Sequence, residues 1–108
     1  MRDVRWALAV AVTLAVLVLP APAAAHPLDP LTPDEIRAAA QIARTDARLT
    51  SALFASILLQ EPAKADVNRW RPGQTGPRLA RLVAMTPASV FEVLVDLTAK
   101  RNVSVVER

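Results

Sequence analysis

Residues 32–60 have the sequence T-P-D-E-I-R-A-A-A-Q-I-A-R-T-D-A-R-L-T-S-A-L-F-A-S-I-L-L-Q, and the spacing of their apolar residues changes once, which decides the fold. Up to residue 47 the spacing is helical. Thr32 is a predicted N-cap, Pro33 suits the first helical position, and Glu35 completes a capping box with Thr32. We therefore expect a helix over residues 33–47. Its apolar face is expected to consist of Ile36, Ala40, Ala43 and Ala47.

From residue 53 onward the apolar residues alternate, which predicts a strand over residues 53–60. One face of this strand is expected to be fully apolar and the other mixed. The apolar face would consist of Leu53, Ala55, Ile57 and Leu59.

Further strands are predicted by the same alternation, and they cover residues 78–85, 91–97 and 103–106. Between the first two strands, the polar residues 64–70 could form a short edge strand, followed by a loop that holds both glycines of the chain. A helix followed by three or four short strands predicts an α+β domain, with the helix covering one face of an antiparallel meander.

The amino terminus has the pattern of a secretory signal peptide over residues 1–25, preceding a domain over residues 26–108. Two arginines precede an uncharged apolar run over residues 6–19, which is too short for a permanent membrane span of roughly 20 residues. Small residues follow it, and cleavage is expected between Ala25 and His26. The alternative is an uncleaved anchor. Removal of the leader predicts an exported protein, secreted or periplasmic, without a permanent membrane anchor.

Composition excludes several classes of function. The formal net charge is only +3, and the basic residues are scattered, so no nucleic-acid partner is expected. The chain has no cysteine, and therefore no disulfide can stabilise the domain in the exported compartment. A domain of about 80 residues has a core of marginal size, so we expect it to depend on a partner or on further chain.

Few residues could carry out catalysis. The sequence contains one histidine, His26, and no tyrosine, which excludes an internal catalytic triad and a metal site built on several imidazoles. Cleavage before His26 would leave an amine and an imidazole that together could chelate copper, although a tight site needs further imidazoles. The other interpretation is that His26 opens an extended arm.

Other polar and aromatic residues have plain structural interpretations. Asp34 and Glu35 complement the dipole of the predicted helix, and Glu92 and Asp96 are expected on a solvated face. Trp70 could present a binding platform between two arginines, but we favour a packing anchor for the loop. The triplet that begins at Asn102, N-V-S, matches a glycosylation sequon, a pattern that is common by chance.

Six blocks of the chain resemble the amino-terminal region of secreted copper amine oxidases. The first is H-P-L-D-P-L-T-P-D-E-I at residues 26–36. The rest follow in the same order: F-A-S-I-L-L-Q-E-P-A-K (54–64), V-N-R-W-R-P-G (67–73), R-L-A-R-L-V (78–83), V-F-E-V-L-V-D-L-T-A (90–99) and V-S-V-V-E (103–107). The resemblance covers almost the whole of the predicted exported chain.

This resemblance implies a cystatin-like α+β module, the first of two non-catalytic modules that precede a β-sandwich catalytic domain in a homodimeric enzyme. Members of the family oxidise primary amines to aldehydes and release ammonia and hydrogen peroxide. They use copper held by three histidines and a topaquinone formed from a tyrosine. One histidine and no tyrosine leave no such residue to transfer, so no cofactor is expected in this chain itself.

The chain departs from the family pattern in its turns. Family members tend to have glycine in the hairpins, where this chain has T-P-A-S (86–89) and A-K-R-N (99–102), and Val105 stands where a tryptophan is frequent.

Two hypotheses follow. The first is a docking module of an amine oxidase, present as a fragment or truncated chain that is inactive alone. The second is a free-standing exported module that binds a protein or peptide. Membrane binding is supported only by the leader.

Overall fold

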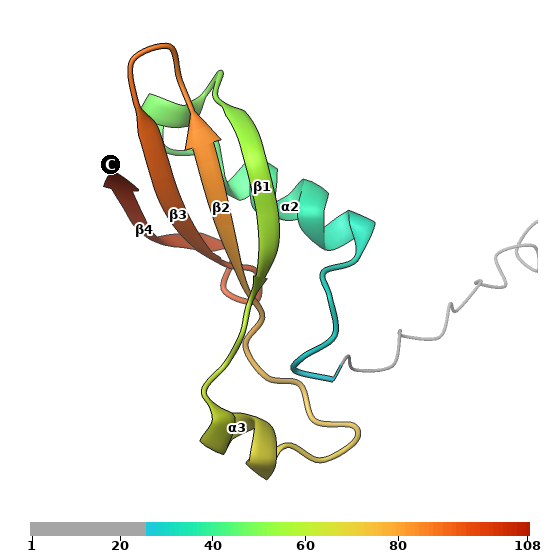
Figure 1. The fold of residues 1–108 in the computed structure, drawn as a ribbon. Helices are drawn as coiled ribbons and strands as arrows, with labels where there is room; N and C mark the ends of the chain where they lie inside the picture. The colour runs from blue at the N-terminus through green and yellow to red at the C-terminus, as the bar shows by residue number, and fades with distance from the viewer. Residues whose placement is uncertain (1–25) are drawn as a thin grey trace, which may run out of the picture.

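The computed structural model describes residues 26–108, and the predicted signal peptide of residues 1–25 lies outside this part of the chain. An α+β fold is confirmed, with one main helix packed on an antiparallel sheet of four strands (Figure 1). The elements follow in the order α2 (Pro33–Ala43), a 3₁₀ turn (Ala47–Leu49), β1 (Leu53–Gln60), α3 (Lys64–Arg69), β2 (Leu79–Met85), β3 (Val90–Asp96) and β4 (Arg101–Glu107).

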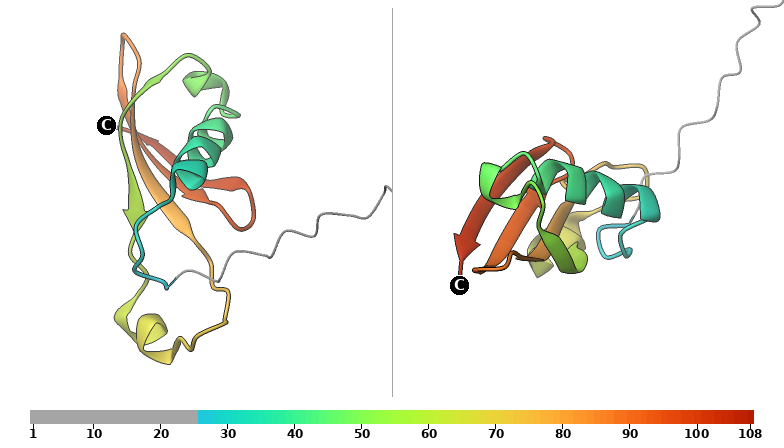
Figure 2. Two further views of the ribbon diagram at one scale, coloured as in Figure 1. Left: turned by 90° about the vertical axis from the view of Figure 1, so that its right-hand side faces the viewer. Right: turned by 90° about the horizontal axis from the view of Figure 1, so that it is seen from above.

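The sheet is a meander in which the strands keep their sequence order, β1-β2-β3-β4. Helix α2 lies on one side of it only, as the left view of Figure 2 shows. The buried core lies between the two, with Leu82, Val93 and Val95 of the central strands almost fully enclosed. Ala39 and Ala43 face this core from α2, and their small side chains let the helix approach the sheet closely.

The helix is shorter than expected, and its buried face is different. It ends at Ala43 instead of residue 47, because Thr45 donates its hydroxyl to the Ile42 carbonyl and Asp46 caps the following 3₁₀ turn. Short polar side chains of this kind compete with helical hydrogen bonds. The buried positions are Ala39 and Ala43, whereas Ile36 is exposed.

Strand β1 does not alternate along its whole length. The register with β2 shifts between Phe54 and Ser56, so the bulge at this point places Phe54 on the helix side together with Ile57. A β-bulge inserts one residue and reverses the alternation beyond it. The expected apolar face is therefore wrong at Leu53, which points away from the helix beside Met85. It is right beyond the bulge, where Ile57 packs against the core and Leu59 pairs with buried Ala80.

Residues 64–70 do not form an edge strand. The backbone N–H groups of Asp66 and Val67 both donate to the Ala63 carbonyl, and α3 covers Lys64–Arg69. The Asp66–Arg69 ion pair spans one turn of this helix, a spacing that supports helical structure. Figure 1 places α3 and the loop after it beyond the end of the sheet.

Candidate functional site

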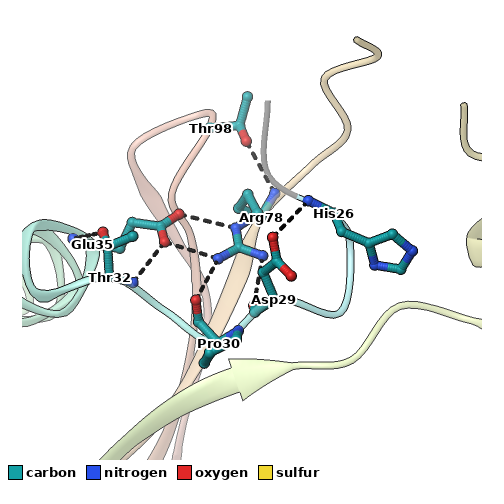
Figure 3. Close-up of polar contacts among 7 residues, drawn as sticks. All are labelled: His26, Asp29, Pro30, Thr32, Glu35, Arg78 and Thr98. Atoms are coloured by element: carbon teal, nitrogen blue, oxygen red, sulfur yellow. Dashed lines mark hydrogen bonds and ion pairs between the residues drawn. The ribbon is translucent and has the colours of Figure 1, made fainter. Parts of the chain in front are cut away.

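The most connected side chain in the described structure is Arg78, which lies immediately before β2 (Figure 3). Its guanidinium binds the Glu35 carboxylate in a bidentate manner, from Nε to Oε2 at 3.0 Å and from Nη2 to Oε1 at 2.8 Å. Nη1 also donates to the Asp29 carbonyl at 3.0 Å, and Nη2 donates to the Pro30 carbonyl at 3.3 Å. We call Arg78, Glu35 and these two carbonyls the arm clamp, because they hold the extended segment 26–31 against the domain.

The arm clamp also reaches the start of the helix and the last turn of the sheet. Glu35 accepts from the Thr32 backbone N–H at 2.9 Å, while the Thr32 hydroxyl accepts from the Glu35 N–H at 3.1 Å. Thr32 and Glu35 thus form the reciprocal capping box of α2. The Arg78 backbone N–H donates to the Thr98 hydroxyl at 3.1 Å.

The charges of the arm clamp satisfy each other. Only 13% of the Arg78 side chain and 25% of the Glu35 side chain are exposed. The hydrogen bonds from Arg78 lower the pKa of Glu35, and the same contacts raise the pKa of Arg78. Because Glu35 stays ionised and fully occupied, it is unsuited to transfer protons. The arm clamp therefore has a structural role, which is to hold the arm and the first turn of α2 in place.

His26 lies at the start of the arm, where its backbone nitrogen and its ring Nδ1 each take part in a hydrogen bond. Its backbone N donates to Asp29 Oδ2 at 2.9 Å, and its Nδ1 accepts from the Leu28 N–H at 3.1 Å. These are the two nitrogens that an amino-terminal copper chelate would use. No group of three or more potential metal-binding side chains occurs within residues 26–108. The donor set of this region therefore does not fit copper. The cleavage site predicted between Ala25 and His26 stays a prediction, because Ala25 lies outside the described residues.

Trp70 fixes the loop that follows α3. Its indole Nε1 donates to the Gln74 carbonyl at 3.1 Å, and the His26 ring packs edge-on against it with the ring centroids 4.8 Å apart. Trp70 also lines an open cavity of about 680 Å³, whose other walls include Pro27, Pro62 and Pro77. The tryptophan therefore anchors the loop against the arm, and it also forms part of a concave surface.

The remaining carboxylates singled out from the sequence are each engaged elsewhere. Asp34 pairs with Arg37, and Asp66 pairs with Arg69. Glu92 pairs with Arg81 on the sheet, and Asp96 accepts from backbone N–H groups in the turn before β4. The structure does not bring these residues together into a common site.

Asn102 contacts the end of α2. Its Nδ2 donates to the Ile42 carbonyl at 3.2 Å and to the Thr45 hydroxyl at 3.4 Å, and its Oδ1 is buried without a hydrogen-bond partner. Glycan attachment needs a free Nδ2. The folded structure therefore disfavours use of the sequon.

None of the ion pairs was predicted from the sequence, and two of them lower the pKa of their carboxylates. Arg78 and Glu35 are 43 residues apart, and no local pattern connects them. Asp46 binds the Arg48 side chain and backbone N–H, and these contacts lower the pKa of Asp46 to about 2. The D-x-R spacing of this second pair is a local signal that could have been used.

Comparison with protein families identifies the family to which this domain belongs. The model of the family "Copper amine oxidase, N2 domain" matches residues 26–105, which is most of the chain. The chain belongs to this family. The N2 domain is an amino-terminal small module of copper amine oxidases, so the resemblance drawn from the six sequence blocks is confirmed. A search of curated proteins found no match for this N2 domain.

The family match and the structure agree in extent. The matched region starts at His26, at the beginning of the clamped arm, and ends within β4.

Within residues 26–108 of this N2 domain, no helix has the length and apolar character needed to cross a bilayer. Copper amine oxidases use copper and topaquinone, but the chain's one histidine and lack of tyrosine mean that neither group can be built here as the resemblance describes.

Proposed function

We propose that this chain is the non-catalytic amino-terminal module of a secreted copper- and topaquinone-dependent primary amine oxidase. Its role is to dock on the catalytic β-sandwich domain and the second small module of the homodimeric enzyme. The observation that carries the proposal is the family match over residues 26–105. The chemistry of the parent enzyme, oxidation of primary amines with release of ammonia and hydrogen peroxide, belongs to the catalytic domain.

The geometry of the described residues supports a structural role. The arm clamp holds its charged groups in fixed, saturated contacts, and the other carboxylates are spread over separate elements. The small core also suits a module that completes its stability against a neighbour.

A peroxide assay tests the non-catalytic part of the proposal. The purified chain is incubated with copper and a primary amine, and peroxide is followed with a peroxidase-coupled dye. We expect no peroxide above the rate of copper with amine alone. An intact copper amine oxidase serves as the positive control. Peroxide release by this chain, in proportion to its concentration, would show that it carries a catalytic centre of its own.

Export is proposed from the pattern of residues 1–25. The test is intact-mass spectrometry of the protein recovered outside the cytoplasm of an expressing cell. We expect a mature chain that begins at His26. Recovery of a chain that retains Met1 would contradict cleavage.

A further inference from the structure

The sheet face opposite α2 carries most of the large apolar side chains that are exposed in residues 26–108. The strand register places Leu53 beside Met85 and Met85 beside Val90, away from the helix. The same face includes Leu58, which pairs with Arg81, and Val106, which pairs with Glu92. We call the set Leu53, Leu58, Met85, Val90 and Val106 the open sheet face; these residues are 73%, 63%, 44%, 40% and 40% exposed.

No element of the described chain covers the open sheet face. The left view of Figure 2 shows α2 packed on the other side, and α3 lies beyond the end of the strands. Adjoining exposed apolar side chains, such as Leu53, Met85 and Val90 across three strands, are typical of an interaction site. Isolated exposed leucines need no such explanation, but here the side chains share one face and extend over all four strands.

The charged groups among these apolar residues are bound to each other. Arg81 Nε donates to Gln60 Oε1 at 2.8 Å, and Arg81 Nη1 lies 3.3 Å from Glu92 Oε2. Arg108 Nη2 lies 3.3 Å from the same Glu92 oxygen. A partner that covers this face would therefore bury charges that already have partners, apart from the one positive charge by which the two arginines exceed Glu92.

The balance of charge among Arg81, Arg108 and Glu92 also indicates which charge the partner surface carries. Two arginines share one glutamate, so the cluster has one positive charge in excess. A carboxylate at the rim of the partner surface would balance it. A nucleic acid or an anionic membrane would instead require several free cationic groups.

We propose that the open sheet face is the docking surface of this module, and that its occupant is an apolar surface of the amine oxidase catalytic domain with a carboxylate opposite Arg81 and Arg108. This inference rests on the proposed function. Two sheet faces stack about 10 Å apart through interdigitated apolar side chains, and this is the geometry in which a sheet of the partner would cover the open sheet face.

The test is isothermal titration of the full chain into the catalytic domain of a copper amine oxidase produced without its own amino-terminal modules. Leu58→Asp and Leu53→Asp each place a charge on the open sheet face at an exposed position, so both variants should fold. Leu28→Asp is the matched control, because Leu28 is a 46% exposed leucine on the arm. Circular dichroism confirms that each variant is folded.

We expect the two variants on the open sheet face to bind about tenfold more weakly than wild type, or worse, and the control to stay within about twofold. Equal binding by wild type, Leu58→Asp and Leu53→Asp would overturn this docking surface and leave the proposed function standing. A wild-type chain that does not bind the catalytic domain would overturn both. Dimerisation of the chain alone that Leu58→Asp abolishes would assign the face to a second copy and overturn the inference.

Discussion

Arg78 is the residue on which the arrangement of the arm and the helix depends. Its side chain donates four hydrogen bonds to the arm and to Glu35 in the first turn of α2, and its backbone N–H donates to Thr98 in the turn before β4; these segments are far apart in sequence. An arginine is suited to this role because its planar fork can bind a carboxylate with two parallel bonds and still have donors for carbonyl groups. A lysine would keep the charge but not the geometry.

Removal of this side chain should destabilise the domain. In Arg78→Ala the Glu35 carboxylate loses its two arginine hydrogen bonds and the Asp29 and Pro30 carbonyl groups lose their arginine donors, so we expect a loss of roughly 1–3 kcal/mol in the free energy of unfolding. Urea denaturation at pH 7, followed by circular dichroism, measures it. The control is Arg37→Ala, which breaks an ion pair whose side chains are 68% and 90% exposed. That change should cost about 0.5 kcal/mol or less. Equal effects of the two substitutions would contradict the importance of the arm clamp.

The arm clamp should also make stability depend on acid pH. Because Arg78 lowers the pKa of Glu35 in the folded chain, the stabilisation is complete above the ordinary glutamate value of 4.5 and is lost as the pH falls through the folded pKa. The difference in stability between wild type and Arg78→Ala should therefore shrink as the pH is lowered from 5 toward 3. Urea midpoints measured over this range check it. A difference that stays constant with pH would show that Glu35 is not the group responsible.

At the scale of elements, the turn between β3 and β4 explains one departure from the family pattern. Lys100 has a φ of 58° in this turn, a left-handed conformation that glycine adopts without a Cβ clash. The sequence therefore has a lysine at a position whose backbone favours glycine, in a hairpin where family members tend to have one.

Lys100→Gly should stabilise the domain by up to about 1 kcal/mol, because removal of the Cβ relieves more strain than the flexibility of glycine costs. Thermal unfolding measures the effect. Ala99→Gly is the control at the neighbouring position, and it should be neutral or destabilising, because Ala99 has no such conformation. A lower melting temperature for Lys100→Gly than for wild type would contradict this interpretation of the turn.

Capping residues and apolar spacing predicted which segments form helix α2 and the strands. They predicted less well where these elements end and which side chains they bury. The capping residues gave the start of α2, and the alternation gave the sheet strands, because both signals depend on neighbours in sequence. The bulge at Phe54, the early end of α2 at Ala43 and the helix α3 depend on how each segment meets the rest of the domain. The arm clamp could not be predicted, since only the fold brings Arg78 to Glu35.

At the scale of the whole molecule, the domain has one covered sheet face and one open face. Helix α2 and the clamped arm complete the first, while the apolar residues of the second remain exposed in the chain by itself. This asymmetry, together with the family match over residues 26–105, supports the docking role that we propose. The stability of the domain should accordingly increase when its partner is present.

Sedimentation velocity of the wild-type chain mixed in equal amounts with an amine oxidase catalytic domain tests the docking role most directly. We predict that the boundary of the free chain disappears and that a single boundary sediments faster than the catalytic domain alone. Two boundaries at the positions of the separate proteins, at concentrations well above those of cellular enzymes, would contradict the role of this chain as a docking module.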